Sequence, residues 1–377
     1  MIITKLRVFR LTIKFKRLVS HNLYRASETE AFITAIEDES GIVGYGEGTP
    51  RTFISGETIE TNIRAASTLG EKLVGKEFKA FDGLKSFLEE IGSLDLAQRE
   101  PSAWCALELS VLDLWAKRKG IPLWQLFTQN PKPGPFVYSA VLPVTNEQAF
   151  HELLSMIKEV GQTNVKLKVA DRVKGIHRIR LIRKVLGSDI NIRVDCNGAF
   201  SSDEALSFLE EAESYSISAV EQPVPKEDFK GLREVSKYAQ TPVIADESLR
   251  TMEDAKKLIE NRCCKGFSVK LSKCGGLFNS LGLLEFARKN RVFCQISCHI
   301  GESAILSAAG RSLVALSHDC RYLEGSFSTH LLEEDLSVDD ISFGRKGYAP
   351  LLTGVGLGIL VDQAKLGKWS KEVSVIV

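Results

Sequence analysis

The stretch Val165-Lys166-Leu167-Lys168-Val169 is a short β-branched run in which two lysines alternate with apolar residues. Side chains on a β-strand point to opposite faces with a period of two, so Lys166 and Lys168 share one face. One interpretation is a strand with a solvated polar face. The other is that one ammonium lowers the pKa of its neighbour, so that a lysine can act as a base near neutral pH. The rest of the sequence helps to decide between these two interpretations.

Seven further runs of β-forming residues share the segment 131–335 with this stretch. The segments between them, such as 147–160, 203–214 and 252–260, are helical in period and long enough for crossover helices. Eight alternating strand and helix steps are typical of a (β/α)₈ TIM barrel, and a doubly wound open sheet is the alternative. The predicted strands span residues 137–140, 165–169, 190–194, 219–220, 243–245, 267–269, 292–296 and 321–323.

Residues 1–130 follow a different pattern, with strands first and helices after them. Two β-rich runs flank the turn cluster 38–41, which predicts a hairpin. The run 102–115 carries apolar residues at helical spacing, with Pro101 at its start and Gly120 after its end. This order predicts an α+β domain over 1–130, followed by the barrel over 131–335 and a C-terminal segment over 336–377.

Composition narrows the classes of partner and compartment. The 377 residues carry a net charge of +1, which argues against a nucleic acid or a membrane surface held by bulk electrostatics. No window approaches the ~18 uninterrupted apolar residues of a transmembrane helix, and the N-terminal residues lack the apolar core of a signal peptide. The eight cysteines form no Cys-x-x-Cys pair, so we expect buried free thiols in a cytosolic protein.

Three carboxylates stand at the ends of successive predicted strands. Asp195, Glu221 and Asp246 follow one another at intervals of 26 and 25 residues, which is close to one strand–helix unit each. In a barrel they would converge at the rim where such enzymes do their chemistry. Three carboxylates held together without a cation are unfavourable, and an all-oxygen set suits Mg²⁺. The alternative is three unrelated acids that cap the following helices.

The lysines flank this predicted metal site. Lys168 lies 27 residues before Asp195, and Lys270 lies 24 residues after Asp246, so the two lysines would face each other across the carboxylates. A metal on a substrate carboxylate stabilises an enediolate while a lysine takes the α-proton. Two lysines on opposite faces allow one to remove the proton and the other to return it. The chemistry that needs both is racemisation or epimerisation.

With these residues in place, the chain resembles the enolase superfamily and, within it, the muconate lactonizing subgroup. The pattern is closest to that of dipeptide epimerases and N-acylamino acid racemases. The motifs that carry the resemblance are Gly44-Tyr45-Gly46-Glu47-Gly48, Ser55-Gly56-Glu57-Thr58, Lys166-x-Lys168, Asp195-x-Asn197, Glu221-Gln222-Pro223, Asp246-Glu247-Ser248 and Lys270-x-x-Lys273-x-Gly275-Gly276.

The resemblance implies an N-terminal capping domain whose loops close over the barrel mouth, with the final residues returning to that domain. It implies one Mg²⁺ per chain, with Mn²⁺ as a substitute, held by the three carboxylates and supported by Asn197 and Glu247. Lys168 and Lys270 would be the acid/base catalysts. Lys166 would tune Lys168 and contact the substrate carboxylate.

The resemblance does not select one substrate, because muconate cycloisomerases, o-succinylbenzoate synthases, N-acylamino acid racemases and dipeptide epimerases share the proton abstraction. Arg25 would pair with an acidic substrate side chain, and a solvated loop arginine is the alternative. After the last predicted strand, dipeptide epimerases typically carry Asp-x-Asp for the substrate ammonium. Here Tyr322 and Glu324 take those places, which argues against free-amine dipeptides and keeps N-acylated amino acids among the candidate substrates. The residues expected to line the substrate pocket are Arg25, Cys298, His299, Glu302 and Glu324, with His299 lacking a clear counterpart in the subgroup.

The sequence therefore predicts an isomerase that racemises or epimerises an amino-acid derivative, with a small carboxylate as its substrate and a homo-oligomer as its assembly. A cycloisomerase or an o-succinylbenzoate synthase-like dehydratase is the alternative within the same subgroup. A non-catalytic binding barrel is the second alternative.

Overall fold

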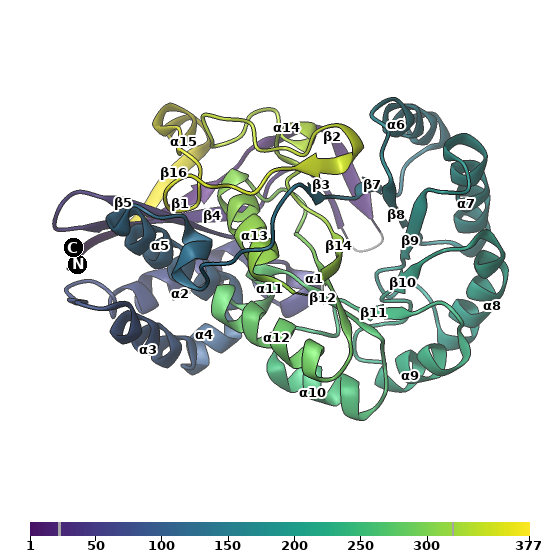
Figure 1. Cartoon of the computed structure of the whole chain (residues 1–377), viewed down its shortest axis with the longest axis horizontal. Helices are drawn as coiled ribbons and strands as arrows, with labels where there is room; N and C mark the ends of the chain where they lie inside the picture. Colours follow the sequence, from purple (N-terminus) through teal and green to yellow (C-terminus); the bar gives the residue numbers. More distant parts are fainter. Residues whose placement is uncertain (22–23, 319) are drawn as a thin grey trace.

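The computed structural model describes residues 1–21, 24–318 and 320–377 (Figure 1). Its central feature is a curved sheet of eight parallel strands in the order β7 to β14, each hydrogen-bonded to the next along the chain. The predicted α/β barrel class is confirmed. The strands are β7 (Ala140–Leu142), β8 (Asn164–Lys168), β9 (Asn191–Asp195), β10 (Ala219–Glu221), β11 (Val243–Ala245), β12 (Gly266–Val269), β13 (Phe293–Ile296) and β14 (Cys320–Leu323).

The two outer strands of this sheet approach each other. The Ser139 N–H, just before β7, donates to the carbonyl of Leu323 in β14 at 2.8 Å. The sheet therefore curls into a barrel, unlike the open doubly wound alternative. The strand predicted over 137–140 is instead split, because Tyr138 bonds to Gly347 before Ser139 turns to β14. Its first part is β6 (Phe136–Val137), which pairs with β15 (Tyr348–Ala349).

Helices connect the barrel strands on the outside of the sheet. Most begin at a Ser, Thr, Asn or Asp whose side chain accepts a backbone N–H of the first turn, such as Asn146 and Thr251. The helices are α6 (Glu147–Glu159), α7 (Arg172–Leu186), α8 (Ser202–Ala212), η2 (Glu213–Tyr215), α9 (Phe229–Tyr238), α10 (Met252–Glu260), α11 (Leu271–Cys274), α12 (Leu277–Lys289) and α13 (Ala304–Leu316). The eighth strand is followed by only the four-residue α14 (Ser328–Leu331), so the predicted eighth strand–helix step is incomplete.

A second, antiparallel sheet has the order β16–β1–β4–β5. The predicted hairpin is confirmed as the pair β4 and β5, and the C-terminal strand β16 pairs with β1 near the N-terminus. The predicted boundaries at residues 130 and 335 stay a prediction. The strands of this sheet are β16 (Ser370–Ile376), β1 (Ile3–Leu11), β4 (Ala31–Asp38) and β5 (Val43–Gly48). The helices outside the strand–helix repeats of the barrel are α1 (Thr52–Ser55), α2 (Ile59–Gly70), α3 (Phe81–Gly92), α4 (Asp95–Arg99), α5 (Pro101–Lys119), η1 (Leu123–Leu126), η3 (Arg345–Gly347) and α15 (Gln363–Trp369).

Strand β5 and helix α5 pack with almost no space between their backbones. A Cβ added at Gly46 would lie 1.9 Å from the Ala106 carbonyl oxygen, and one at Gly44 would lie 2.1 Å from that of Ser110. The alternating glycines of β5 therefore form a groove that only a strand without side chains on that face can offer. Helix α5 is buried from Ser102 to Ala116 as a result.

A separate hairpin, β2 (Lys14–His21) and β3 (Tyr24–Glu28), reaches the carboxyl end of the barrel. Phe15 forms a β-bridge with Leu332, and the Lys16 ammonium donates to the Thr329 carbonyl. A Cβ at Gly301, in the loop after β13, would meet the Phe15 ring at 3.0 Å. The hairpin thus lies against the loops that follow the last two barrel strands. Within the described ranges, no helix combines the length and apolar character needed to cross a bilayer.

Candidate active site

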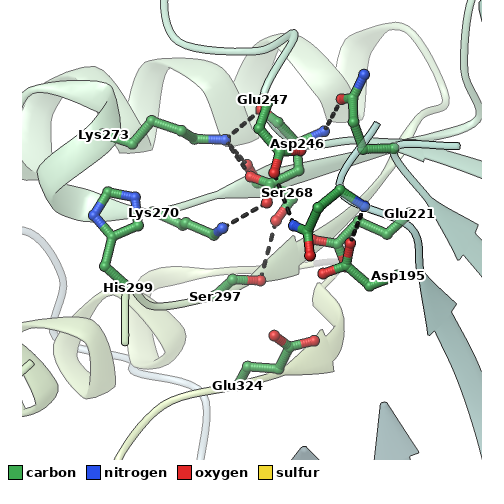
Figure 2. A network of polar contacts seen from close by, with 12 residues as sticks. Asp195, Glu221, Asp246, Glu247, Ser268, Lys270, Lys273, Ser297, His299 and Glu324 are labelled. Atoms are coloured by element: carbon green, nitrogen blue, oxygen red, sulfur yellow. Dashed lines mark hydrogen bonds and ion pairs between the residues drawn. The ribbon is translucent and has the colours of Figure 1, made fainter. Parts of the chain in front are cut away.

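Parallel pairing places the predicted site residues at one level of the barrel. Lys168 is the register partner of Asp195, and Asp195 is the register partner of Glu221. Asp246 follows the end of β11, the next strand in the sheet. The three carboxylates and the β8 lysines therefore meet at the carboxyl edge of the sheet, as strand spacing predicts. Figure 2 shows the carboxylates with Lys270 and Lys273 approaching Asp246.

Lys166 is buried among three carboxylates. Its Nζ lies 3.0 Å from Asp195 Oδ2, 3.0 Å from Glu221 Oε2 and 2.6 Å from Glu324 Oε2. Burial lowers the pKa of Lys166, but the surrounding carboxylates outweigh it and hold the pKa well above the usual value. The three carboxylates therefore hold Lys166 as a cation.

Lys168 is more accessible than Lys166 and has two polar partners. Its Nζ lies 2.6 Å from Asp195 Oδ2 and donates to Asn197 Oδ1 at 3.0 Å. The carboxamide of Asn197 in turn donates to Glu247 Oε1 at 2.8 Å. Asn197 thus links the Lys168 side of the site to Glu247. Asp195 Oδ2 also lies between Lys166 and Lys168, so a carboxylate separates the two ammonium groups.

On the opposite side, two further lysines hold Asp246. Lys270 Nζ lies 2.5 Å from Asp246 Oδ2, and Lys273 Nζ lies 2.7 Å from Asp246 Oδ1. Lys273 also donates to the carbonyls of Asp246 and Ser268, at 2.7 and 2.8 Å. Burial raises the pKa of Asp246, but Lys270 and Lys273 outweigh it and hold that pKa well below its usual value. The Asp246 carboxylate is therefore charged, and each of its oxygens contacts one lysine.

Two residues next to the carboxylates, Asn197 and Gln222, have a strained backbone conformation. Gln222 has φ = 37° and Asn197 has φ = 43°, a region that residues other than glycine seldom adopt. The Gln222 carboxamide oxygen accepts the backbone N–H groups of Asp246 and Ser248, at 3.0 and 3.2 Å. The strained residue after β10 thus fixes the loop that carries Asp246.

The donor set fits a hard divalent cation. Asp195, Glu221 and Asp246 are fully buried, and Glu221 Oε1 has no hydrogen-bond partner among the described residues. Burial and the neighbouring Asp195 raise the pKa of Glu221 to about 8, although the Lys166 ammonium lies beside its Oε2. In the described part of the chain, no three His, Cys, Asp or Glu side chains already surround an ion position, because lysine ammonium groups lie between the carboxylates. All-oxygen ligands of this kind suit Mg²⁺.

A buried polar network, which strand spacing alone did not single out, fills the barrel beneath the site. Arg193 donates to Gln295 Oε1 and to Glu324 Oε1, both at 2.9 Å, and Gln295 donates to Glu221 Oε2 at 2.9 Å. The Arg193 guanidinium also lies 4.3 Å from the centroid of the Tyr322 ring. Arg193 stands two residues before Asp195 on β9, so the two side chains point to the same face of the strand. This spacing is the sequence signal that could have identified Arg193. Glu324 thus contacts two cations of the protein.

The loop after β13 carries the other predicted pocket residues. His299 Nδ1 lies 2.9 Å from the Thr49 carbonyl oxygen, and its backbone N–H donates to Glu302 Oε1 at 2.6 Å. Burial raises the pKa of Glu302 to about 8. Cys298 is partly exposed. Arg25 is exposed on β3.

Two family descriptions match most of the chain. Residues 149–365 match the enolase C-terminal domain-like family, which alone covers more than half of the sequence. Residues 15–128 match the N-terminal domain of the mandelate racemase/muconate lactonizing enzyme family.

Relatives of known activity match most of the chain. A hydrophobic dipeptide epimerase of Enterococcus faecalis is 27% identical over 350 residues, which are 92% of this chain and 96% of the relative. An N-succinyl-L-Arg/Lys racemase of Bacillus cereus is 27% identical over 315 residues, 81% of each chain. The crystal structure of a dipeptide epimerase from Cytophaga hutchinsonii, complexed with Mg and D-Ala-L-Val, has a TM-score of 0.91 at 25% identity, and the match covers both chains fully. The chain belongs to the mandelate racemase/muconate lactonizing enzyme family and is an isomerase of the enolase superfamily.

Proposed function

We propose that the protein racemises or epimerises an amino-acid derivative by removing the proton α to a carboxylate. The observation that carries the proposal is the placement of Lys168 and Lys270, from β8 and the end of β12, on either side of Asp195, Glu221 and Asp246. The similarity to dipeptide epimerases and an N-succinyl-amino acid racemase supports the same reaction class.

In this proposal Asp195, Glu221 and Asp246 hold one Mg²⁺, for which Mn²⁺ can substitute. When bound, the ion supplies positive charge that offsets the negative charge developing on the substrate carboxylate. The Mg in the Cytophaga hutchinsonii relative and the buried, unpartnered Glu221 Oε1 support this assignment. Asn197 and Glu247 hold the Lys168 end of the ligand set through their mutual hydrogen bond.

In this proposal Lys168 and Lys270 transfer the proton. The neutral amine of one lysine takes the α-proton, and the electron pair of the broken C–H bond spreads into the carboxylate as an enediolate. The ammonium of the other lysine returns a proton to the opposite face of the same carbon, which inverts its configuration. Lys166 remains protonated between its carboxylates and contributes fixed positive charge beside the reacting carboxylate.

For the substrate, the charges around Glu324 favour an N-acylated amino acid. Its two oxygens already contact Lys166 and Arg193, so it offers no spare negative charge to a free ammonium. A dipeptide is the second candidate, because the Enterococcus faecalis relative epimerises dipeptides. Cys298, His299 and Glu302, with Arg25 from the hairpin, would complete the pocket.

The test is α-proton exchange in D₂O. The Mg²⁺-loaded protein should introduce deuterium at Cα of N-succinyl or N-acetyl amino acids and produce the other enantiomer, with dipeptides assayed in parallel. Formation of an alkene or a lactone without enantiomer interconversion would instead assign a dehydratase or a cycloisomerase. Failure to bind Mg²⁺ in calorimetry would favour a binding barrel.

We also infer that the protein acts in the cytosol on a small carboxylate, without a nucleic-acid or membrane partner, and as a homo-oligomer. Light scattering on the purified protein tests the assembly. A monomer at micromolar concentration would contradict it.

A further inference from the structure

His299 joins the N-terminal sheet to the Lys270 side of the site. Its ring is buried, and Nδ1 lies 2.9 Å from the Thr49 carbonyl oxygen and 3.2 Å from Thr49 Oγ1. A carbonyl oxygen only accepts hydrogen bonds, so Nδ1 carries the proton. Thr49, just after β5, also donates its backbone N–H to Ser272 Oγ at 2.9 Å, two residues beyond Lys270. The same threonine therefore fixes His299 and the segment that follows Lys270.

The other ring nitrogen of His299 is an unused acceptor. With the proton on Nδ1, Nε2 presents only a lone pair, and it has no hydrogen-bond partner among the described residues. Buried acceptors without partners are rare in folded proteins and call for an explanation. Burial, together with the positive charges of Lys270 and Arg51, holds the pKa of His299 well below its usual value, so the ring is neutral.

Lys270 is one of the two cations whose positive charge lowers the pKa of His299. In Figure 2 the Lys270 side chain and the His299 ring lie on the same side of Asp246, with the Lys270 Nζ directed toward Asp246. At present Lys270 Nζ is held by Asp246 Oδ2 at 2.5 Å. A cation bound by Asp246 would compete for that oxygen and repel the ammonium. Lys270 would then need a different partner.

We propose that His299 is a positioning residue for Lys270, whose Nζ donates a hydrogen bond to His299 Nε2 once Asp246 binds the cation. The inference rests on the proposed function of Lys270. Glu247 Oε2 is also buried and without a hydrogen-bond partner among the described residues, so it is the competing acceptor. A carboxylate would attract the ammonium and hold its proton, whereas a neutral imidazole orients Lys270 without that attraction. A lysine that acts as a base needs the neutral imidazole, because the imidazole orients the amine without holding its proton.

The first experiment compares His299→Asn with His299→Gln in the Mg²⁺-loaded enzyme. The Asn side chain can replace Nδ1 toward Thr49 but has no atom in the place of Nε2, whereas the Gln carboxamide reaches that place. Deuterium exchange is measured separately from each enantiomer of an N-succinyl amino acid. His299→Asn should slow exchange from the enantiomer that Lys270 deprotonates by at least about tenfold, because the base loses its orientation, and leave the other enantiomer within about twofold. His299→Gln should restore most of the loss. Equal losses from both enantiomers, or none, would overturn the proposal.

The second experiment needs no substrate. In protein labelled with ¹⁵N-histidine, the Nε2 signal of His299 is assigned by its absence in His299→Asn and followed as Mg²⁺ is added. Mg²⁺ should shift this signal in the direction of an accepted hydrogen bond in the wild type, but not in Lys270→Ala. The same shift in Lys270→Ala, or no shift in the wild type, would contradict the proposal. If the wild type exchanges no substrate proton, the proposed function fails, while the NMR result still decides the role of His299.

Discussion

Lys166 Nζ lies 2.6 Å from Glu324 Oε2 inside the barrel, and both side chains are almost completely buried. The second oxygen of Glu324 accepts a hydrogen bond from Arg193 at 2.9 Å. One carboxylate thus compensates two buried cations beneath the site. In the proposed function, this pairing leaves Glu324 no spare negative charge for a substrate ammonium.

Glu324→Gln should therefore destabilise the fold. The substitution leaves Lys166 and Arg193 short of one buried counter-charge, and breaking a buried pair costs about 3 to 5 kcal/mol. Urea denaturation measures the change in the free energy of unfolding. The control is Glu253→Gln, which removes an exposed pair with Lys257 and should change that free energy by less than about 1 kcal/mol. Equal effects of the two substitutions would show that Glu324 does not compensate buried charge.

The close packing of β5 against α5 leads to a second prediction, which concerns stability. Gly46→Ala places a Cβ 1.9 Å from the Ala106 carbonyl oxygen, so the strand and the helix must separate, at a cost of about 3 kcal/mol. Gly83→Ala is the matched control, because Gly83 lies within α3 with no heavy atom within 4 Å of the added Cβ. It should stabilise the protein by about 0.5 to 1 kcal/mol through helix propensity. Thermal or urea unfolding measures the change in the free energy of unfolding for both variants. An unchanged free energy of unfolding in Gly46→Ala would contradict the close packing.

Metal binding should depend on Glu221 but not on an equally buried glutamate elsewhere. Glu221→Gln should weaken Mg²⁺ binding more than the roughly 10- to 100-fold expected for a residue that only holds a ligand in place. Glu108→Gln is the control, because Glu108 is as buried but accepts the N–H groups of Leu277 and Phe278 at the start of α12. Isothermal calorimetry with MgCl₂ measures both. Unaltered affinity in Glu221→Gln would remove it from the ligand set.

The buried Glu47 makes stability depend on pH. It accepts hydrogen bonds from Ser303 and Leu306 at the start of α13, and burial raises its pKa from 4.5 to about 7. The folded state therefore binds a proton that the unfolded state has lost between those two pH values. The stabilisation is fully present below pH 4.5 and is lost as pH rises through 7.

Urea denaturation at pH 5, 7 and 8.5 tests this titration. The free energy of unfolding of the wild type should fall with pH relative to that of Glu47→Gln, by up to about 1.4 kcal/mol per pH unit. The difference between the two proteins isolates Glu47 from the other buried carboxyl groups. A difference that is constant with pH would contradict the raised pKa.

The sequence predicts the barrel and the level of the site well, and the reasons are local. Each of Asp195, Glu221 and Asp246 ends a short β-rich run, and parallel pairing then aligns them at one edge. The helix from Pro101 and the β4–β5 hairpin also carry complete local signals and are confirmed. Family membership and the isomerase class are confirmed as well.

The features that local sequence signals do not predict depend on contacts between segments that are distant in the sequence. The run 137–140 has the composition of one strand, but Tyr138 and Ser139 bond to residues near 347 and 323, which splits it. No spacing rule pairs Thr49 with His299, because the two come from different sheets. The engagement of Glu324 by Arg193 likewise depends on which side chains fill the barrel interior. The roles of Arg25 and Cys298 stay predictions.

The two-lysine mechanism is tested most directly by enantiomer-resolved α-proton exchange in D₂O, with Lys168→Ala and Lys270→Ala compared in the Mg²⁺-loaded protein. Each variant should lose exchange from one enantiomer of an N-succinyl amino acid and keep it from the other, with opposite choices in the two variants, and neither should interconvert the enantiomers. Loss of exchange from both enantiomers in only one variant, with the other variant active on both, would show that a single lysine is the base and would contradict the mechanism.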